Sequence, residues 1–212
     1  MLQHLSETVA VKKISEKNNL GVFYIEGLYT GYGLTIGNSL RRTLLSSIPG
    51  AAVTQIKIKG VSHEFSTLPN MLEDVIELTL NFKKVRFRFF ADEPQVLALK
   101  VRGEKAVTAG DIKTNPQVEV VNPDLKIATL TKKSAELDLE LTVEKGLGYM
   151  PSESKKFERL PIGTIVIDAI FSPVTKANFS VENMRVGERT DYNRLKLEIE
   201  TDGSITPGAA LH

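Results

Sequence analysis

The sequence predicts a mixed fold in which two helices accompany many short strands. Two segments, residues 33–48 and 70–82, place apolar side chains at helical spacing, whereas most other apolar segments are short and alternate with polar residues. Turn sequences such as Asn122-Pro123 separate those segments. Hydrophobic residues make up 42% of the 212-residue chain, which is enough for a sizeable core.

The first helix is predicted over residues 33–48. Its apolar stripe follows a four-residue repeat, broadened by one neighbouring leucine, and consists of Ile36, Leu40, Leu44, Leu45 and Ile48. Thr35 and Asn38 carry side-chain oxygens that can cap the free N–H groups at the start of the helix. Pro49-Gly50 ends the helix, because proline cannot continue its hydrogen bonds and glycine tolerates a left-handed turn.

The other elements are placed by alternation and by turn residues. Before the first helix we expect a hairpin of residues 9–17 and 20–28. The strands expected after it are residues 52–59, 85–90, 96–101, 118–120, 127–129, 137–144, 164–171, 177–185 and 194–200. Near the end, Thr206-Pro207 predicts a helix start, with a capping residue followed by proline in the first turn.

Residues 85–90 permit a second interpretation. Phe87 and Phe89 alternate there with Arg86 and Arg88, and interleaved aromatic and basic side chains can bind single-stranded nucleic acid. On a strand, however, the same alternation places the aromatic rings on one face and the arginines on the other, as in any half-buried strand. We favour the core strand and keep an RNA-binding sheet that uses Phe87 and Phe89 as the alternative.

Charge and composition exclude several classes of protein. Lys and Arg total 27 against 26 Asp and Glu, so the net charge is +1 and only a local patch could bind nucleic acid. The absence of cysteine excludes disulfides, thiolate metal sites and a cysteine nucleophile. The start of the chain lacks a signal-peptide pattern, and no apolar run approaches the roughly 20 residues that cross a bilayer. We therefore expect a cytoplasmic protein without membrane contact.

The sequence contains no catalytic constellation. The three histidines His4, His63 and His212 are not at metal-ligand spacing with one another or with acidic residues. A phosphate-binding glycine-rich loop and an aspartate cluster for two metal ions are also absent. We therefore expect no catalytic residues, no metal and no cofactor. Two classes stay open: an assembly scaffold whose surfaces bind larger subunits, and an enzyme whose site is dispersed in sequence.

Residues 33–50 closely resemble the first dimerisation helix of the bacterial RNA polymerase α subunits. Further segments that resemble this family follow in the family's order along nearly the whole chain: residues 63–67, 73–83, 146–149, 161–163, 167–169, 171–174 and 185–191. The resemblance implies a non-catalytic subunit of DNA-directed RNA polymerase. It favours the scaffold over the enzyme with a dispersed site.

The resemblance also implies an α+β fold with two subdomains. Residues 1–50 and 173–212 would form a dimerisation subdomain, a sheet plus a helix, and residues 51–172 an inserted β-rich subdomain. In the family, two copies dimerise through the first helix and a carboxy-terminal helix. The residues that this assigns to a homodimer interface are Leu34, Ile36, Leu40, Leu44 and Ile48. Because the sequence stops where the second of those helices begins, we expect a weak, concentration-dependent dimer.

The family's dimer receives the β subunit on one protomer and the β′ subunit on the other. Carried over residue by residue, the β contacts fall on Arg42, Leu45 and Glu77. The β′ contacts fall on Lys83, Ile167 and Arg194. Arg42 is the strongest candidate, because it lies off the apolar stripe and a guanidinium suits multidentate interface contacts. Direct binding of nucleic acid is not expected from this part of the subunit.

Overall fold

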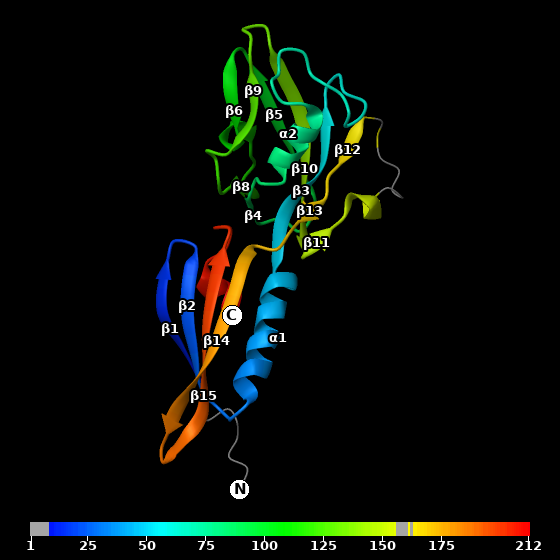
Figure 1. The fold of residues 1–212 in the computed structure, drawn as a ribbon. Helices are drawn as coiled ribbons and strands as arrows, with labels where there is room; N and C mark the ends of the chain where they lie inside the picture. Colours follow the sequence, from blue (N-terminus) through cyan, green and yellow to red (C-terminus); the bar gives the residue numbers. More distant parts are fainter. Residues whose placement is uncertain (1–8, 156–160, 162) are drawn as a thin grey trace. The chain divides into compact units, whose positions relative to one another are not determined.

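The computed structural model describes residues 9–155, 161 and 163–212. The chain forms two compact units, one from Met1–Ile48 with Ser172–His212 and the other from Pro49–Phe171. The first unit is therefore discontinuous in sequence. The fold is α+β, with far more strand than helix (Figure 1). In the described part of the chain, no helix combines the length and apolar character needed to cross a membrane.

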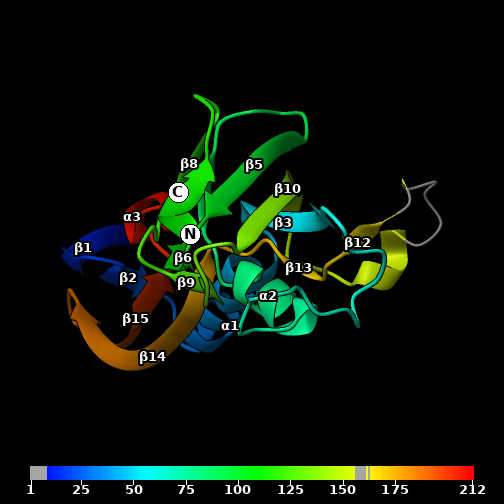
Figure 2. The ribbon, with the colours of Figure 1, turned by 90° about the horizontal axis from the view of Figure 1, so that it is seen from above.

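The first unit is built on a four-stranded antiparallel sheet. Its strand order is β1 (Ala10–Lys17), β2 (Leu20–Leu28), β15 (Arg189–Thr201) and β14 (Val174–Val186). The predicted hairpin of β1 and β2 is present, and β15 pairs with β2, so segments from both ends of the chain share one sheet (Figure 1). Strand β14 curves strongly in Figure 2, and its pairing with β15 contains two register shifts, which bend a strand.

Helix α1 (Tyr32–Ser46) packs on β14 and β15. Two glycines bring its backbone close to the sheet: a Cβ at Gly37 would lie 2.5 Å from the ring of Phe179, and one at Gly33 would lie 2.6 Å from Val181. The core beneath the helix consists of Phe23, Leu44, Val174, Ala177, Leu197, Ile199 and Ala210. The glycines therefore occupy the helix positions that lie nearest to the strands.

The caps predicted for α1 are wrong. Thr35 and Asn38 lie inside the helix, and its N-cap residue is Gly31, whose φ of 86° is in the left-handed region and which has no side chain to cap with. The acceptor for the first turn comes instead from Asn193 on β15. At the other end of the unit the prediction is confirmed, because α3 (Pro207–Leu211) begins with Thr206 as its N-cap.

The second unit contains a five-stranded antiparallel sheet. Its strand order is β12 (Thr164–Val166), β3 (Pro49–Ile58), β10 (Glu136–Leu147), β5 (Gln95–Arg102) and β7 (Ile112–Lys113). Three smaller antiparallel pairs accompany it: β4 (Phe87–Phe89) with β8 (Val118–Val120), β6 (Lys105–Thr108) with β9 (Lys126–Leu130), and β11 (Tyr149–Met150) with β13 (Ala169–Ile170). Alternate residues of β3, β5 and β10 point into one core, whose fully buried members include Ile56, Leu97, Leu99, Leu139 and Leu141.

Helix α2 (Val75–Phe82) is shorter than the predicted helix over residues 70–82. Asp74 caps it, because its carboxylate accepts a hydrogen bond from the backbone N–H of Glu77 at 2.6 Å. Before the cap, Met71 forms a β-bridge with Leu130. The predicted helix was too long because the apolar segment before the cap takes part in this strand contact and is not helical.

Candidate protein-interaction surfaces

The outward side of α1 is the first candidate surface. Leu34 is 61% exposed and Tyr32 is 49% exposed, which is high for large apolar side chains on a helix that packs against a sheet. The members of the predicted stripe that are half-buried against the unit's own core are Ile36, Leu40 and Ile48. Leu44 is 3% exposed and therefore enclosed by its own chain. Leu34 presents the most apolar surface of the five predicted dimer residues.

Arg42 is exposed on α1 beside Arg41. Neither guanidinium forms an ion pair with another residue within the part of the chain that the structure describes. A guanidinium without an intramolecular partner keeps its five N–H donors for another chain. Leu45, the neighbouring predicted contact, is half-buried against the core below the helix.

Arg194 lies on the other face of the same sheet. Residues alternate along β15, so Asn193 and Leu195 face α1 and Arg194 faces away from it. Its guanidinium pairs with Glu182 and lies 4.7 Å from the centre of the Tyr24 ring. The hydrogen bond with Glu182 raises the pKa of Arg194 above its usual value. The structure therefore separates Arg194 from Arg42 and already provides it with partners.

A groove of about 630 Å³ in the second unit brings two predicted contact residues together. Lys83 and Ile167 both line it, beside Glu64, Phe65, Ile76, Thr79 and Asp168. Ile167 is only 4% exposed, so its side chain belongs mainly to the core behind the groove. Glu77 is exposed on the first turn of α2 but does not line the groove.

Asp168 holds Lys83 at the wall of this groove. One carboxylate oxygen accepts a hydrogen bond from Lys83 Nζ, and the other accepts one from the backbone N–H of Ser152, each at 2.8 Å. These two bonds, that of Lys83 first, lower the pKa of Asp168 from 3.8 to about 2. Sequence reasoning did not identify Asp168 as a site residue, although a lone carboxylate in an apolar strand is a signal, because burying it requires a partner.

The RNA-binding alternative is wrong about Phe87. This ring is 2% exposed and lies inside the hydrophobic core, and Phe89 packs half-buried against the same core. Arg88, the basic residue between them, pairs with Glu119 on β8 at 2.9 Å. A ring enclosed by protein cannot stack on a base, so the alternation marks a half-buried strand.

No metal or cofactor site is evident in the described ranges, 9–155, 161 and 163–212. Within them, no group of three or more His, Asp and Glu side chains is arranged to hold a metal ion. Every buried side-chain nitrogen and oxygen there has a hydrogen-bond partner, so none is left directed at a missing ligand.

Comparison with known proteins assigns the family. Residues 56–172 match the RNA polymerase Rpb3/RpoA insert domain. The DNA-directed RNA polymerase subunit alpha of Symbiobacterium thermophilum is 53% identical over 197 residues, which cover 93% of this chain and 62% of that protein. That of Alkaliphilus oremlandii is 50% identical over 203 residues, covering 96% and 64%. That of Desulforudis audaxviator is 48% identical over 211 residues, covering 100% and 67%.

This chain thus spans between 62% and 67% of the length of these three relatives. The match to the insert domain covers the second unit from residue 56 onward and ends at Ser172, one residue beyond it, and the similarity to the relatives covers both units. The chain belongs to the family of DNA-directed RNA polymerase α subunits.

Proposed function

We propose that this chain is the assembly scaffold of a DNA-directed RNA polymerase: it forms a homodimer and binds the β and β′ subunits without contributing catalytic residues. The observation that carries the proposal is the similarity to α subunits over both units, at about 50% identity. The guanidinium of Arg42, which has no ion pair within the described part of the chain, and the exposed Leu34 on α1 support it, because both are available to another chain. A subunit of a DNA-directed RNA polymerase acts in the compartment that holds the DNA. In bacteria this is the cytoplasm, which supports a cytoplasmic location for this chain.

The contact residues form two groups on the first unit. On one side, Arg42 and Leu45 on α1 would contact the β subunit. On the other face of the sheet, Arg194 would contact the β′ subunit. Because the two groups lie on opposite faces, one protomer of the proposed dimer can use the first for the β subunit and the other protomer the second for the β′ subunit. Dimerisation would use Leu34 and the exposed edges of Ile36, Leu40 and Ile48, with Leu44 supporting them from inside the protomer.

The second unit supplies the remaining contacts. Glu77 would bind the β subunit from the exposed side of α2. Lys83 would bind the β′ subunit from the groove, with Ile167 as the apolar support behind it. A lysine that Asp168 already pairs has a defined position and keeps further N–H donors for a partner.

Reconstitution tests the proposal. The purified chain is mixed with the β and β′ subunits of the same source, and the mass of the resulting complex is measured. We expect a complex with two copies of this chain, and no metal-dependent nucleotide incorporation by the chain alone. Failure to recover either large subunit would contradict the scaffold, and incorporation by the isolated chain would contradict its non-catalytic role.

A further inference from the structure

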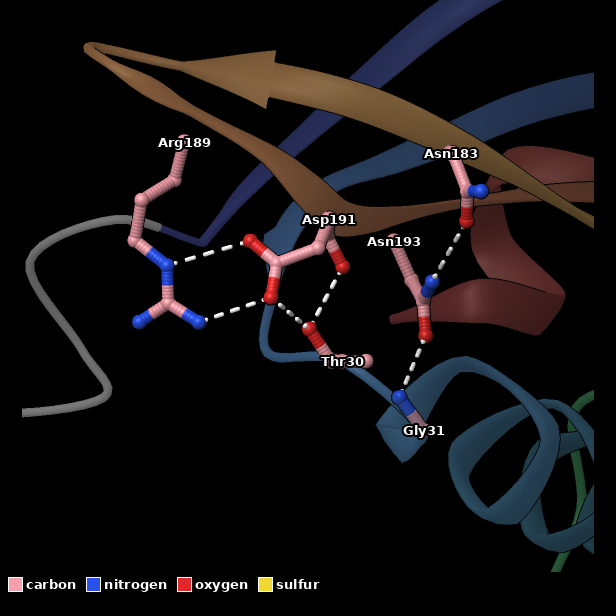
Figure 3. Close-up of polar contacts among 6 residues, drawn as sticks. All are labelled: Thr30, Gly31, Asn183, Arg189, Asp191 and Asn193. Atoms are coloured by element: carbon pink, nitrogen blue, oxygen red, sulfur yellow. Dashed lines mark hydrogen bonds and ion pairs between the residues drawn. The ribbon is translucent and has the colours of Figure 1, made fainter.

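The first turn of α1 lacks a cap of its own. The backbone N–H groups at a helix start have no partner within the helix and need acceptors from elsewhere. Gly31, at the N-cap position, has no side chain to supply one. The Oδ1 atom of Asn193 accepts from the N–H of Gly31 at 2.9 Å (Figure 3). It also accepts from the N–H of Gly33 at 3.4 Å. Helix α1 is thus capped by a strand that follows it by about 160 residues.

The capping amide is itself held in place. Asn193 is 6% exposed, and its Nδ2 atom donates to Oδ1 of Asn183, its direct neighbour across the β14–β15 pair, at 3.4 Å. This bond turns the amide oxygen toward the helix, as Figure 3 shows. A Cβ at Gly33 would lie 3.2 Å from Cβ of Asn193, so the glycine allows the helix to approach the amide.

A second link ties the preceding residue to the same hairpin. The hydroxyl of Thr30 donates to the backbone oxygen of Asp191 at 2.6 Å and lies 2.8 Å from its carboxylate. Arg189 binds both carboxylate oxygens of Asp191, at 3.0 and 2.7 Å. Asp191 is exposed, so this ion pair adds little stability in water. Its effect is to orient the carboxylate toward Thr30.

These links act on the turn of α1 that carries the exposed apolar side chains. Tyr32 and Leu34, 49% and 61% exposed, lie on the first turn beside the capped N–H groups. Further along, Leu40 and Leu44 fix the helix through the apolar core. The middle of the helix is therefore held by the apolar core, whereas the polar links of its start come from Asn193 and from the Thr30–Asp191 contact.

We propose that Asn193 is a positioning residue for self-association: its amide caps α1 from β15 and so fixes the turn that presents Tyr32 and Leu34 to a second copy of the chain. The inference rests on the proposed function, because it takes the homodimer from there. It adds that the β14–β15 hairpin, which carries none of the predicted dimer residues, controls dimer strength through Asn193.

The test compares four variants with the wild-type chain by sedimentation over a wide concentration range. Asn193→Ala removes the acceptor, and Asn193→Asp keeps one, because an aspartate caps as well as an asparagine. The carboxylate has no donor for Oδ1 of Asn183, but the exposed Asn183 amide can turn round and donate to it instead. Asn178→Ala changes an exposed asparagine of the same hairpin. Ile199→Val destabilises the sheet core without touching the cap. We expect the dimer dissociation constant to rise on the order of tenfold in Asn193→Ala and to stay near the wild-type value in the other three.

Thermal melting and amide hydrogen exchange separate positioning from general instability. We expect faster exchange at Gly31 and Gly33 in Asn193→Ala, with exchange near the wild-type rate in Asn193→Asp. Equal loss of self-association in Ile199→Val, at a matched loss of melting temperature, would overturn the inference, and so would failure of Asn193→Asp to restore it. A wild-type chain that stays monomeric would also overturn it, whereas recovery of the β and β′ subunits by that monomer would still support the scaffold.

Discussion

Arg42 and Arg194 are both arginines on the surface of the first unit, yet their surroundings differ. Arg42 has no ion-pair partner among the described residues, whereas Arg194 is held by Glu182 and Tyr24. A partner carboxylate can bind Arg42 without displacing anything but water. At Arg194 it would have to exchange an existing ion pair. At an equal loss of folding stability, truncation of Arg42 should therefore weaken partner binding more than truncation of Arg194.

Replacing Arg42 by alanine should impair binding of the β subunit and leave the fold intact. The side chain is exposed and has no ion pair among the described residues, so the fold should lose little, while loss of an interface arginine can cost roughly 2 kcal/mol or more of binding free energy. Thermal melting and co-purification with β measure the two effects. Arg41→Ala, at the neighbouring exposed arginine, is the matched control. Wild-type recovery of β, or a variant that simply unfolds, would contradict the prediction.

The ion pair of Asp168 and Lys83 should make the stability of the second unit depend on pH in the acid range. Because the pKa of Asp168 is lowered from 3.8 to about 2, its contribution is complete above pH 4 and is lost as the pH falls toward 2. Asp168→Asn should therefore lower the melting temperature at neutral pH and differ less from wild type near pH 2.5. The effect is small, since Lys83 and Asp168 are 26% and 30% exposed.

The control for this pH dependence is Asp124→Asn, at an exposed aspartate without an ion pair in the described chain. Its difference from wild type should show no comparable change between neutral and acid pH. A constant difference between Asp168→Asn and wild type over the same range would contradict the assignment.

At the scale of elements, the close approach of α1 to β14 depends on glycine. Gly37→Ala should lower stability by about 1–3 kcal/mol, although alanine is the better helix former, because the new methyl group would meet the Phe179 ring. Chemical denaturation measures this. In a Phe179→Leu background the same substitution should cost less, and Asn38→Ala on the exposed side of α1 should be nearly neutral. Equal costs in the two backgrounds would exclude the clash.

Elements that form from neighbouring residues were predictable from the sequence. The hairpin of β1 and β2, the helix α1 and the start of α3 follow from patterns within a few residues, and the structure contains them. The cap of α1 was not predictable, because Asn193 is distant in sequence and carries no local mark of its contact. The predicted start of α2 was wrong for a similar reason: Met71 pairs with Leu130, which is distant in sequence.

For the site residues, the sequence indicated which side chains could take part in an interface, but not which neighbours each of them has in the folded chain. Arg42 lies off the apolar stripe, and exposure follows from that position. Period alone could not tell which of Leu34 and Leu44 is buried, because both are apolar and the helix packs through Gly33 and Gly37. The pairing of Lys83 with Asp168 joins the end of α2 to the segment between β12 and β13, so it could be seen only in the folded structure.

At the scale of the whole molecule, self-association should be weak and concentration-dependent. Stable homodimers usually bury on the order of 2,000 Å² or more, and the exposed apolar side chains of α1 are few. Sedimentation over a wide concentration range measures the dissociation constant. Leu34→Asp should raise it strongly, because it puts a charge into the proposed interface.

Leu72→Asp is the matched control for Leu34→Asp, because Leu72 is 70% exposed on the second unit. It should leave the dissociation constant unchanged. A dimer that survives extreme dilution would contradict the expected weakness, and equal effects of the two substitutions would contradict the placement of the interface on α1.

The insertion of the second unit into the first sets an order for folding during synthesis. On the ribosome, β1, β2 and α1 emerge before the inserted unit. The hairpin of β1 and β2 can form at once, but the other edge of β2 has to wait for β15, and α1 for an amide 162 residues behind Gly31. The inserted unit is complete in sequence earlier and is free to fold first. A nascent chain therefore exposes the uncapped start of α1 until β15 has been synthesised, and the proposed pairing with a second copy has to wait for that strand.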